Sequence, residues 1–138
     1  GVPEEKYEIH GRVELWYNPP RGWIILKDGI VVEMSLLPRS LGEVVNQYGE
    51  PDQVMISIFK DEHHGGASTW LLFSQHHLAV GVSGEFYSFS PDLRVGGYKV
   101  APDYFDEFVK AWGLDGNSTP GETKLPIAWP GFAVTPTP

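Results

Sequence analysis

The sequence predicts an α+β protein with a mainly antiparallel sheet, made of β-hairpins and a meander, and two short helices packed on one face. Over most of the chain before residue 115, apolar and polar residues alternate as they do in half-buried strands. Two separate stretches instead repeat apolar residues at helical spacing. Strands that follow one another through short turns favour antiparallel pairing over parallel βαβ units.

The first expected strand covers residues 7–17, because apolar side chains recur there at every second position. Its apolar face consists of Tyr7, Ile9, Gly11, Val13, Leu15 and Tyr17. Pro19 and Pro20 end this strand, since proline donates no hydrogen bond to a ladder.

A hairpin is expected next, around Asp28-Gly29, between strands at residues 23–27 and 30–36. Both central positions of a type I′ turn need positive φ, which Asp-Gly tolerates. The expected pairs are Lys27 with Ile30, Ile25 with Val32, and Trp23 with Met34.

The first helix is expected after Ser40, because Ser40 and Glu43 form a capping box. Its apolar stripe is Leu41, Val44, Val45 and Tyr48, and Gly49 and Pro51 end it. Three further strands are expected at residues 53–60, 69–74 and 78–89, with a turn at residues 75–77. The second helix is expected over residues 103–112. Its stripe is Phe105, Phe108, Val109 and Trp112.

The chain is expected to form one domain over residues 1–114, followed by a proline-rich tail over residues 115–138. The tail contains Pro120, Pro126, Pro130, Pro136 and Pro138, five of the 12 prolines. It also carries Ile127, Trp129 and Phe132, which a solvated linker has little reason to contain. We therefore expect part of the tail to run back across the body.

Composition excludes several classes of protein. The formal net charge of −8 argues against binding to nucleic acid or to an anionic membrane surface. The absence of cysteine excludes a disulfide scaffold, a thiol nucleophile and an all-cysteine metal site. No apolar stretch approaches the length of a transmembrane helix.

No motif predicts a catalytic residue, a metal site or a cofactor. Two histidine doublets, His63-His64 and His76-His77, contain metal-ligating side chains, but the strand between them would hold them roughly 20 Å apart. Each doublet is interpreted as a pair of polar residues at the tip of a loop, with no metal bound. The segment Gly81-Val82-Ser83-Gly84 lacks a spacer residue of the nucleophile elbow and is not followed by a helix pattern.

The predicted binding surface is the sheet face opposite the helices, formed by Met55, Phe59, Trp70 and Tyr87. Large aromatic side chains supply most of the energy at protein interfaces. The alternative is that the N-terminal strands or the tail around Trp129 and Phe132 cover this face, because soluble monomers rarely expose large apolar patches.

The segment from Ser40 to Val54, a capped helix containing Glu43-Val44 and closed by Gly49-Glu50-Pro51 before a hydrophobic meander, resembles modules of the small outer-membrane lipoproteins. That group includes a small subunit of the β-barrel assembly machinery, and β-lactamase inhibitor proteins share its helix-plus-sheet unit. Uncharacterised bacterial lipoproteins look similar. This chain departs from the pattern because a hairpin at residues 23–36 stands where the family has its first helix, so no functional residue is carried over. The resemblance implies a non-catalytic extracytoplasmic module that binds protein through its sheet.

The leading functional hypothesis is therefore an extracytoplasmic protein-binding or scaffold domain, with a cytoplasmic location as the alternative. A second hypothesis is an acidic inhibitor or immunity-type protein that binds a basic partner, as the net charge suggests. An enzyme without a recognisable motif is third. The coding sequence upstream of Gly1 would discriminate between the locations, since a hydrophobic segment ending in a lipid-bearing cysteine marks a lipoprotein.

Overall fold

Nine strands form one sheet in the computed structural model, which describes residues 2–18, 22–60, 65–83, 89–115 and 122–132. The order across the sheet is β1-β2-β3-β4-β8-β7-β6-β5-β9, and each neighbouring pair of strands is antiparallel. This confirms the predicted α+β class. The elements are β1 (Glu5–Ile9), β2 (Arg12–Tyr17), β3 (Gly22–Lys27), β4 (Ile30–Ser40), α1 (Leu41–Tyr48), β5 (Gln53–Lys60), β6 (Gly65–Phe73), the 3-10 helix η1 (Ser74–His76), β7 (Leu78–Ser83), β8 (Arg94–Val100), α2 (Pro102–Ala111) and β9 (Glu122–Ile127).

The prediction of a single N-terminal strand over residues 7–17 is wrong, because the chain reverses direction in the middle of this segment. His10 and Gly11 have φ angles of 48° and 81°, which makes a two-residue hairpin turn between β1 and β2. The Gly11 carbonyl accepts a hydrogen bond from the Asp28 backbone N–H, 2.9 Å away. The reversal puts Tyr7 opposite Glu14, so Tyr7 and Ile9 of β1 lie on the other face of the sheet from Val13 and Leu15 of β2.

The Asp28-Gly29 hairpin is confirmed, with φ angles of 51° and 79° and with Lys27 opposite Ile30. The other two expected pairs are wrong, because the register shifts between Ile25 and Leu26. Beyond this irregularity Ile25 lies opposite Glu33, and Ile24 lies opposite Met34. An extra residue in one strand shifts all later pairs in this way.

The predicted first helix is confirmed as α1. The Ser40 side chain accepts a hydrogen bond from the Glu43 backbone N–H at 3.2 Å, which satisfies one of the unpaired donors of the first turn. The Glu43 carboxylate lies 3.6 Å from Arg39 Nε. Gly49 ends the helix with a φ of 84°, and its N–H donates to the Val45 carbonyl.

The expected meander is confirmed as β5, β6 and β7, with η1 and the left-handed residue His77 between the last two. The last strand was expected over residues 78–89; β7 covers its first part, and residues 84–88 lie outside the described residues. Helix α2 lies within one residue of its expected range. Strand β8 was not predicted. It lies between β4 and β7 and joins the N-terminal strands to the meander.

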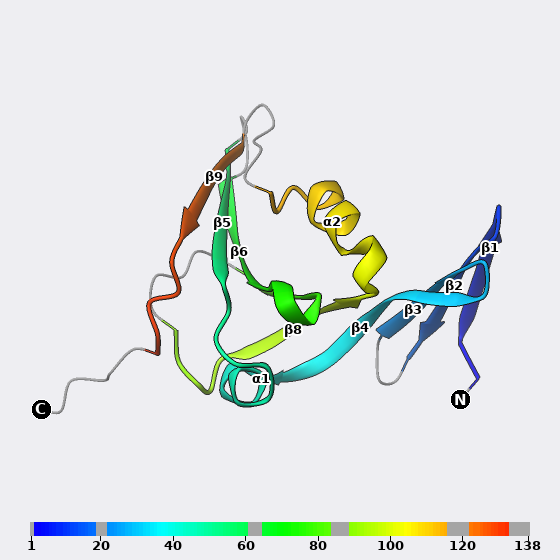
Figure 1. The fold of residues 1–138 in the computed structure, drawn as a ribbon, viewed down its shortest axis with the longest axis horizontal. Coiled ribbons are helices and arrows are strands. Elements are labelled where there is room, and N and C mark those ends of the chain that lie inside the picture. The colour runs from blue at the N-terminus through cyan, green and yellow to red at the C-terminus, as the bar shows by residue number, and fades with distance from the viewer. Residues whose placement is uncertain (1, 19–21, 61–64, 84–88, 116–121, 133–138) are drawn as a thin grey trace, which may run out of the picture.

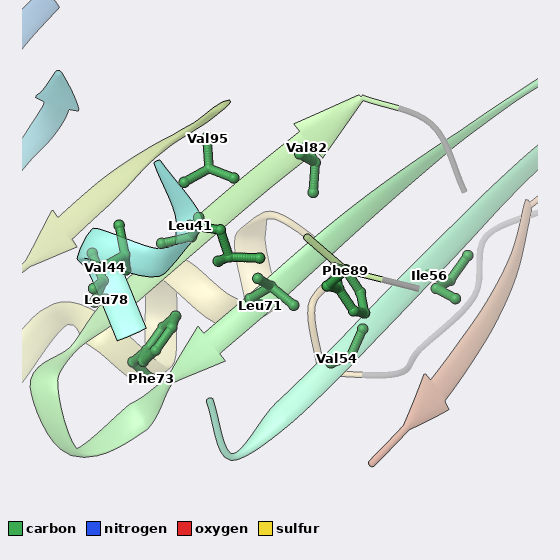
Figure 2. Close-up of a cluster of buried hydrophobic side chains, with 11 residues drawn as sticks. Leu41, Val44, Val54, Ile56, Leu71, Phe73, Leu78, Val82, Phe89 and Val95 are labelled. Atoms are coloured by element: carbon green, nitrogen blue, oxygen red, sulfur yellow. The ribbon is translucent and has the colours of Figure 1, made fainter. Parts of the chain in front are cut away.

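The prediction that both helices pack on one face is wrong: α1 and α2 lie on opposite faces of the sheet. Leu41 and Val44 of α1 pack against Leu71 and other residues of one cluster, shown in Figure 2. Phe105 and Phe108 of α2 pack instead in a cluster that contains Leu72. Because Leu71 and Leu72 are adjacent in β6, their side chains point to opposite faces. We call these faces the α1 face and the α2 face.

The sheet is strongly curved, and α2 lies on its concave side (Figure 1). In the same view α1 lies outside the curve, and β1 and β9 lie toward opposite ends of the molecule. Strand β9, from the expected tail, adds to the edge of the sheet next to β5. Trp129 follows it and lies 5.0 Å from Phe89 between ring centroids, in the cluster of the α1 face. The described part of the tail therefore packs on the body.

Candidate binding cleft on the concave face

Five aromatic side chains form a continuous row across the concave α2 face. Ring-centroid distances are 5.2 Å from Trp16 to Trp23, 5.0 Å from Trp23 to Tyr98, and 5.2 Å from Tyr98 to Trp112. Trp70 joins the row at 5.8 Å from Tyr98. These distances lie in the range at which aromatic rings attract one another. We call these five residues the aromatic row.

Strand register assembles the row from segments that are distant in the sequence. Trp16 of β2 lies opposite Trp23 of β3, and Tyr98 of β8 lies opposite Ser35 of β4. Trp70 of β6 lies opposite Gly81 of β7. A Cβ atom at Gly81 would be 3.2 Å from the Trp70 ring, so the absence of a side chain at this position lets the indole lie flat over β7.

Two hydrogen bonds from Trp23 to acceptors in β4 hold the middle of the aromatic row. Trp23 Nε1 donates to Glu33 Oε2 at 2.9 Å, and the Trp23 backbone N–H donates to Ser35 Oγ at 2.9 Å. Burial raises the pKa of the Tyr98 hydroxyl above its ordinary value, and the nearby Glu33 carboxylate raises it further. The phenol is therefore neutral at physiological pH and retains its proton as a hydrogen-bond donor.

A cleft of about 260 Å³ opens where α2 faces strands β2, β3 and β4. Arg12, Lys27 and Glu33 line it from the sheet. Tyr104, Glu107 and Trp112 line it from the helix and its C-terminal end. Trp112 is 46% exposed, so the aromatic row ends in an accessible indole inside this cleft. We call it the α2 cleft.

The charged side chains of the α2 cleft are balanced in sign, and three of them already have partners. Arg12 Nη2 lies 3.3 Å from Glu14 Oε1, and Glu33 accepts from the Trp23 indole. Lys27 Nζ lies 5.5 Å from the centroid of the Tyr104 ring, a cation–π contact. The arrangement offers hydrogen-bond donors, acceptors and aromatic surface together, which suits the binding of a mixed polar and apolar ligand.

Two residues of the predicted binding surface, Met55 and Trp70, lie opposite each other in β5 and β6. Met55 is fully buried, so its side chain offers no surface to a partner. Trp70 is half-buried beneath α2, 5.7 Å from Trp112. The side chain of Phe59 and all of Tyr87 lie outside the described residues. Among the described residues, Trp70 packs against the cluster that contains Phe105 and Phe108 of α2, a cover that the sequence did not predict.

The cleft residue that sequence reasoning missed is Trp112. It was assigned to the packed stripe of the second helix, but it is the C-cap of α2 and reaches the open cleft. The helical pattern could not reveal this, because Tyr98, which contacts Trp112, lies on strand β8 and not on the helix. No local pattern around Trp112 signals this position.

The described histidine doublet packs against aromatic rings. The His76 ring lies 5.3 Å from that of Tyr48, and the His77 ring lies 5.6 Å from that of Phe105. The doublet His63-His64 falls outside the described residues. In the part of the chain that the structure describes, no three His, Asp or Glu side chains gather as metal ligands would.

Comparison of the chain with protein-family models found no match, and neither a curated protein nor a solved structure is similar to it. Within the described ranges, neither helix has the length and apolar character needed to cross a bilayer.

Proposed function

We propose that this chain is a non-catalytic protein-binding domain and that it holds a segment of its partner in the α2 cleft. The observation that carries this proposal is the aromatic row, which ends at the half-exposed indole of Trp112 inside the cleft. Tryptophan, tyrosine and arginine are the residues that contribute most to protein interfaces, and Arg12, Tyr104 and Trp112 all line the cleft.

The charge distribution favours a peptide segment over a small ion of one sign. The sheet side of the cleft carries Arg12, Lys27 and Glu33, and the helix side carries Glu107, so charges of both signs line it. A peptide presents both N–H and C=O groups along its backbone and an apolar side chain for the aromatic surface. One extended segment can therefore satisfy both walls of the cleft at the same time.

We further propose that the protein works outside the cytoplasm, and we base this on the resemblance of residues 40–54 to small lipoproteins. Fractionation of cells that express the complete coding sequence tests the location. Recovery with the envelope or the medium supports the proposal, and recovery only in the cytosol contradicts it.

Selection from a displayed library of random peptides tests the binding site. Peptides enriched on the wild-type protein are expected to bind Trp112→Ala at least about tenfold more weakly, the effect of losing one interface hot spot. Tyr7→Ala is the matched control, because Tyr7 is an aromatic residue 50% exposed but lies outside the cleft. Equal affinity for the wild type and Trp112→Ala would contradict the proposal.

A second variant separates loss of binding from loss of fold. Glu107 lines the cleft and is exposed, so Glu107→Lys changes the charge of one wall without removing an aromatic contact. Peptides selected on the wild type should bind this variant more weakly, while its thermal midpoint stays unchanged. Unaltered binding by both variants would place the binding site elsewhere.

The net charge of −8 favours a second candidate, an acidic inhibitor or immunity-type protein that binds a basic partner. In the α2 cleft, however, the carboxylates of Glu33 and Glu107 are balanced by Arg12 and Lys27. Attraction of a basic partner would then act through the whole surface and fall steeply with ionic strength. An association rate that does not depend on salt would exclude this candidate.

A further inference from the structure

Strand β1 lies at one end of the sheet, and its outer edge pairs with no other strand that the structure describes (Figure 1). All five of its residues are exposed, and among the described residues only β2 pairs with it. An open edge presents a row of backbone N–H and C=O groups on which another strand can pair. At the opposite edge β9 contains Pro126, which lacks an N–H, and proline is a common way to block pairing at an edge. Strand β1 contains no proline.

The hairpin geometry fixes which groups of β1 face outward. The two residues that flank a two-residue turn form a hydrogen-bonded pair, so the N–H and C=O of Ile9 point toward Arg12. Alternation along the strand then directs the N–H and C=O of Lys6 and Glu8 to the open edge. Before the strand, the Glu4 N–H donates inward to the Trp16 carbonyl at 2.7 Å, so the open stretch begins after Glu4.

The side chains of this edge are complementary to themselves. Lys6 and Glu8 share one face of β1, and their charged groups lie 3.9 Å apart. If two copies of β1 pair antiparallel about Tyr7, Lys6 stands opposite the partner's Glu8, and Glu8 stands opposite the partner's Lys6. Both pairs join residues with outward backbone groups, so four backbone hydrogen bonds and two ion pairs form together.

Other registers are unfavourable for reasons of charge or geometry. A shift of one strand by two residues places Lys6 opposite Lys6, or Glu8 opposite Glu8, in the two copies. A shift by one residue sets outward backbone groups against inward ones, and the ladder does not form. In the favoured register the two Tyr7 rings meet across the axis on the α2 face, which shelters a side chain that is 50% exposed in one copy.

We propose that two copies of this chain associate through β1, antiparallel and centred on Tyr7, and so continue the sheet from one copy into the other. The arrangement has two-fold symmetry, and the same patch is used on both copies. The contact is small compared with the roughly 1,000 Å² or more buried in stable complexes, so the dimer dissociates on dilution. This inference does not rest on the proposed binding function of the α2 cleft.

Sedimentation velocity with charge variants tests the proposal. The wild type is expected to change from monomer toward dimer as its concentration rises from low micromolar to millimolar. Lys6→Glu or Glu8→Lys places like charges in both pairs, so each single variant should stay monomeric over the same range. The exposed position of both side chains means that the fold tolerates these changes, which circular dichroism checks.

Two combinations make the test specific to the register. The double variant Lys6→Glu/Glu8→Lys exchanges the charges and is expected to dimerise like the wild type. An equimolar mixture of the two single variants should also form dimers, because each supplies the charges that the other needs. A wild type that stays monomeric at millimolar concentration overturns the proposal, and so do single variants that associate as the wild type does. Failure of the double variant or of the mixture to dimerise overturns the proposed register.

Discussion

Adjacent glycines in β8 provide the sharpest test of how the two halves of the sheet are joined. Gly97 lies opposite Val80 of β7 and Leu36 of β4. A Cβ atom at position 97 would overlap the Ala79 carbonyl oxygen and would come within 2.9 Å of Val80 Cα. These are backbone atoms of a paired strand, so relief requires the β7–β8 ladder to shift. Gly96 differs, because a Cβ atom there would meet nothing within 4 Å.

The expected magnitudes follow from this difference. Overpacking at well-packed positions lowers the free energy of unfolding by about 1–3 kcal/mol. Because the obstacle is backbone on the neighbouring strand, we expect Gly97→Ala to fall in the upper half of that range. Gly96→Ala should change the free energy of unfolding by at most about 1 kcal/mol, and in the stabilising direction, since alanine loses less backbone entropy on folding.

Urea denaturation followed by tryptophan fluorescence measures both variants against the wild type. The midpoint for Gly97→Ala should fall clearly below that for Gly96→Ala, with equal slopes for all three proteins. Equal midpoints for the two variants would refute the close approach of β8 to β7. A lower midpoint for Gly96→Ala than for Gly97→Ala would contradict the placement of both residues.

Three further predictions concern the first helix, the aromatic row and the tail. Ser40→Ala removes the acceptor for the Glu43 N–H and should lower the free energy of unfolding by about 1 kcal/mol, whereas Ser40→Thr should retain most of it in the same urea titration. The pKa of Tyr98 is raised above the ordinary 10.0, so its contribution to stability is present below pH 10.0 and is lost as pH rises through the folded pKa. Absorbance at 295 nm should show a tyrosine that ionises late. Tyr98→Phe should remove this step, and Glu33→Gln should shift it to lower pH. Trp129→Ala removes the ring that packs on Phe89 and should lower the thermal midpoint, with a cost of about 2 kcal/mol for a half-buried indole; an unchanged midpoint would mean that the tail contributes nothing to the fold.

The sequence predicted those parts of the fold that local chemistry determines. Asp28-Gly29 specifies its turn because few other residue pairs adopt two positive φ angles, and Ser40 specifies the start of α1 because its hydroxyl caps the first turn. His10-Gly11 forms the same kind of turn, but histidine at positive φ is uncommon, and the alternating pattern runs through it without a break. Local patterns therefore identified one hairpin and missed the other.

Non-local contacts determine the parts that the sequence did not predict. Gly96-Gly97 interrupts the apolar alternation of β8, although position 97 requires glycine because β7 approaches it so closely. The run Trp70–Phe73 is apolar at every position, which is typical of a strand buried on both faces, and this was the signal that the helices lie on opposite sides. The assignment of both helices to one face overlooked it.

The candidate site could not be predicted from the sequence for the same reason. Trp23 and Trp112 are separated by most of the chain. Both contact Tyr98 only because β3, β4 and β8 are neighbours in the sheet and α2 folds back over it. The sequence placed Trp70 on a sheet face without helices, whereas α2 packs on that face. The sequence could not indicate that α2 packs against residues of β6, β7 and β8 on this face, or that a cleft remains open between α2 and strands β2–β4.

The most direct test of the central claim, that the protein binds a peptide in the α2 cleft, is to follow the five tryptophan indole N–H signals by NMR while a library-selected peptide is added. The signals of Trp112 and of Trp23, whose indole donates to the cleft residue Glu33, should shift in proportion to occupancy. The signal of Trp129, which lies on the α1 face, should stay in place. Shifts confined to Trp129, with Trp112 and Trp23 unmoved, would contradict the account.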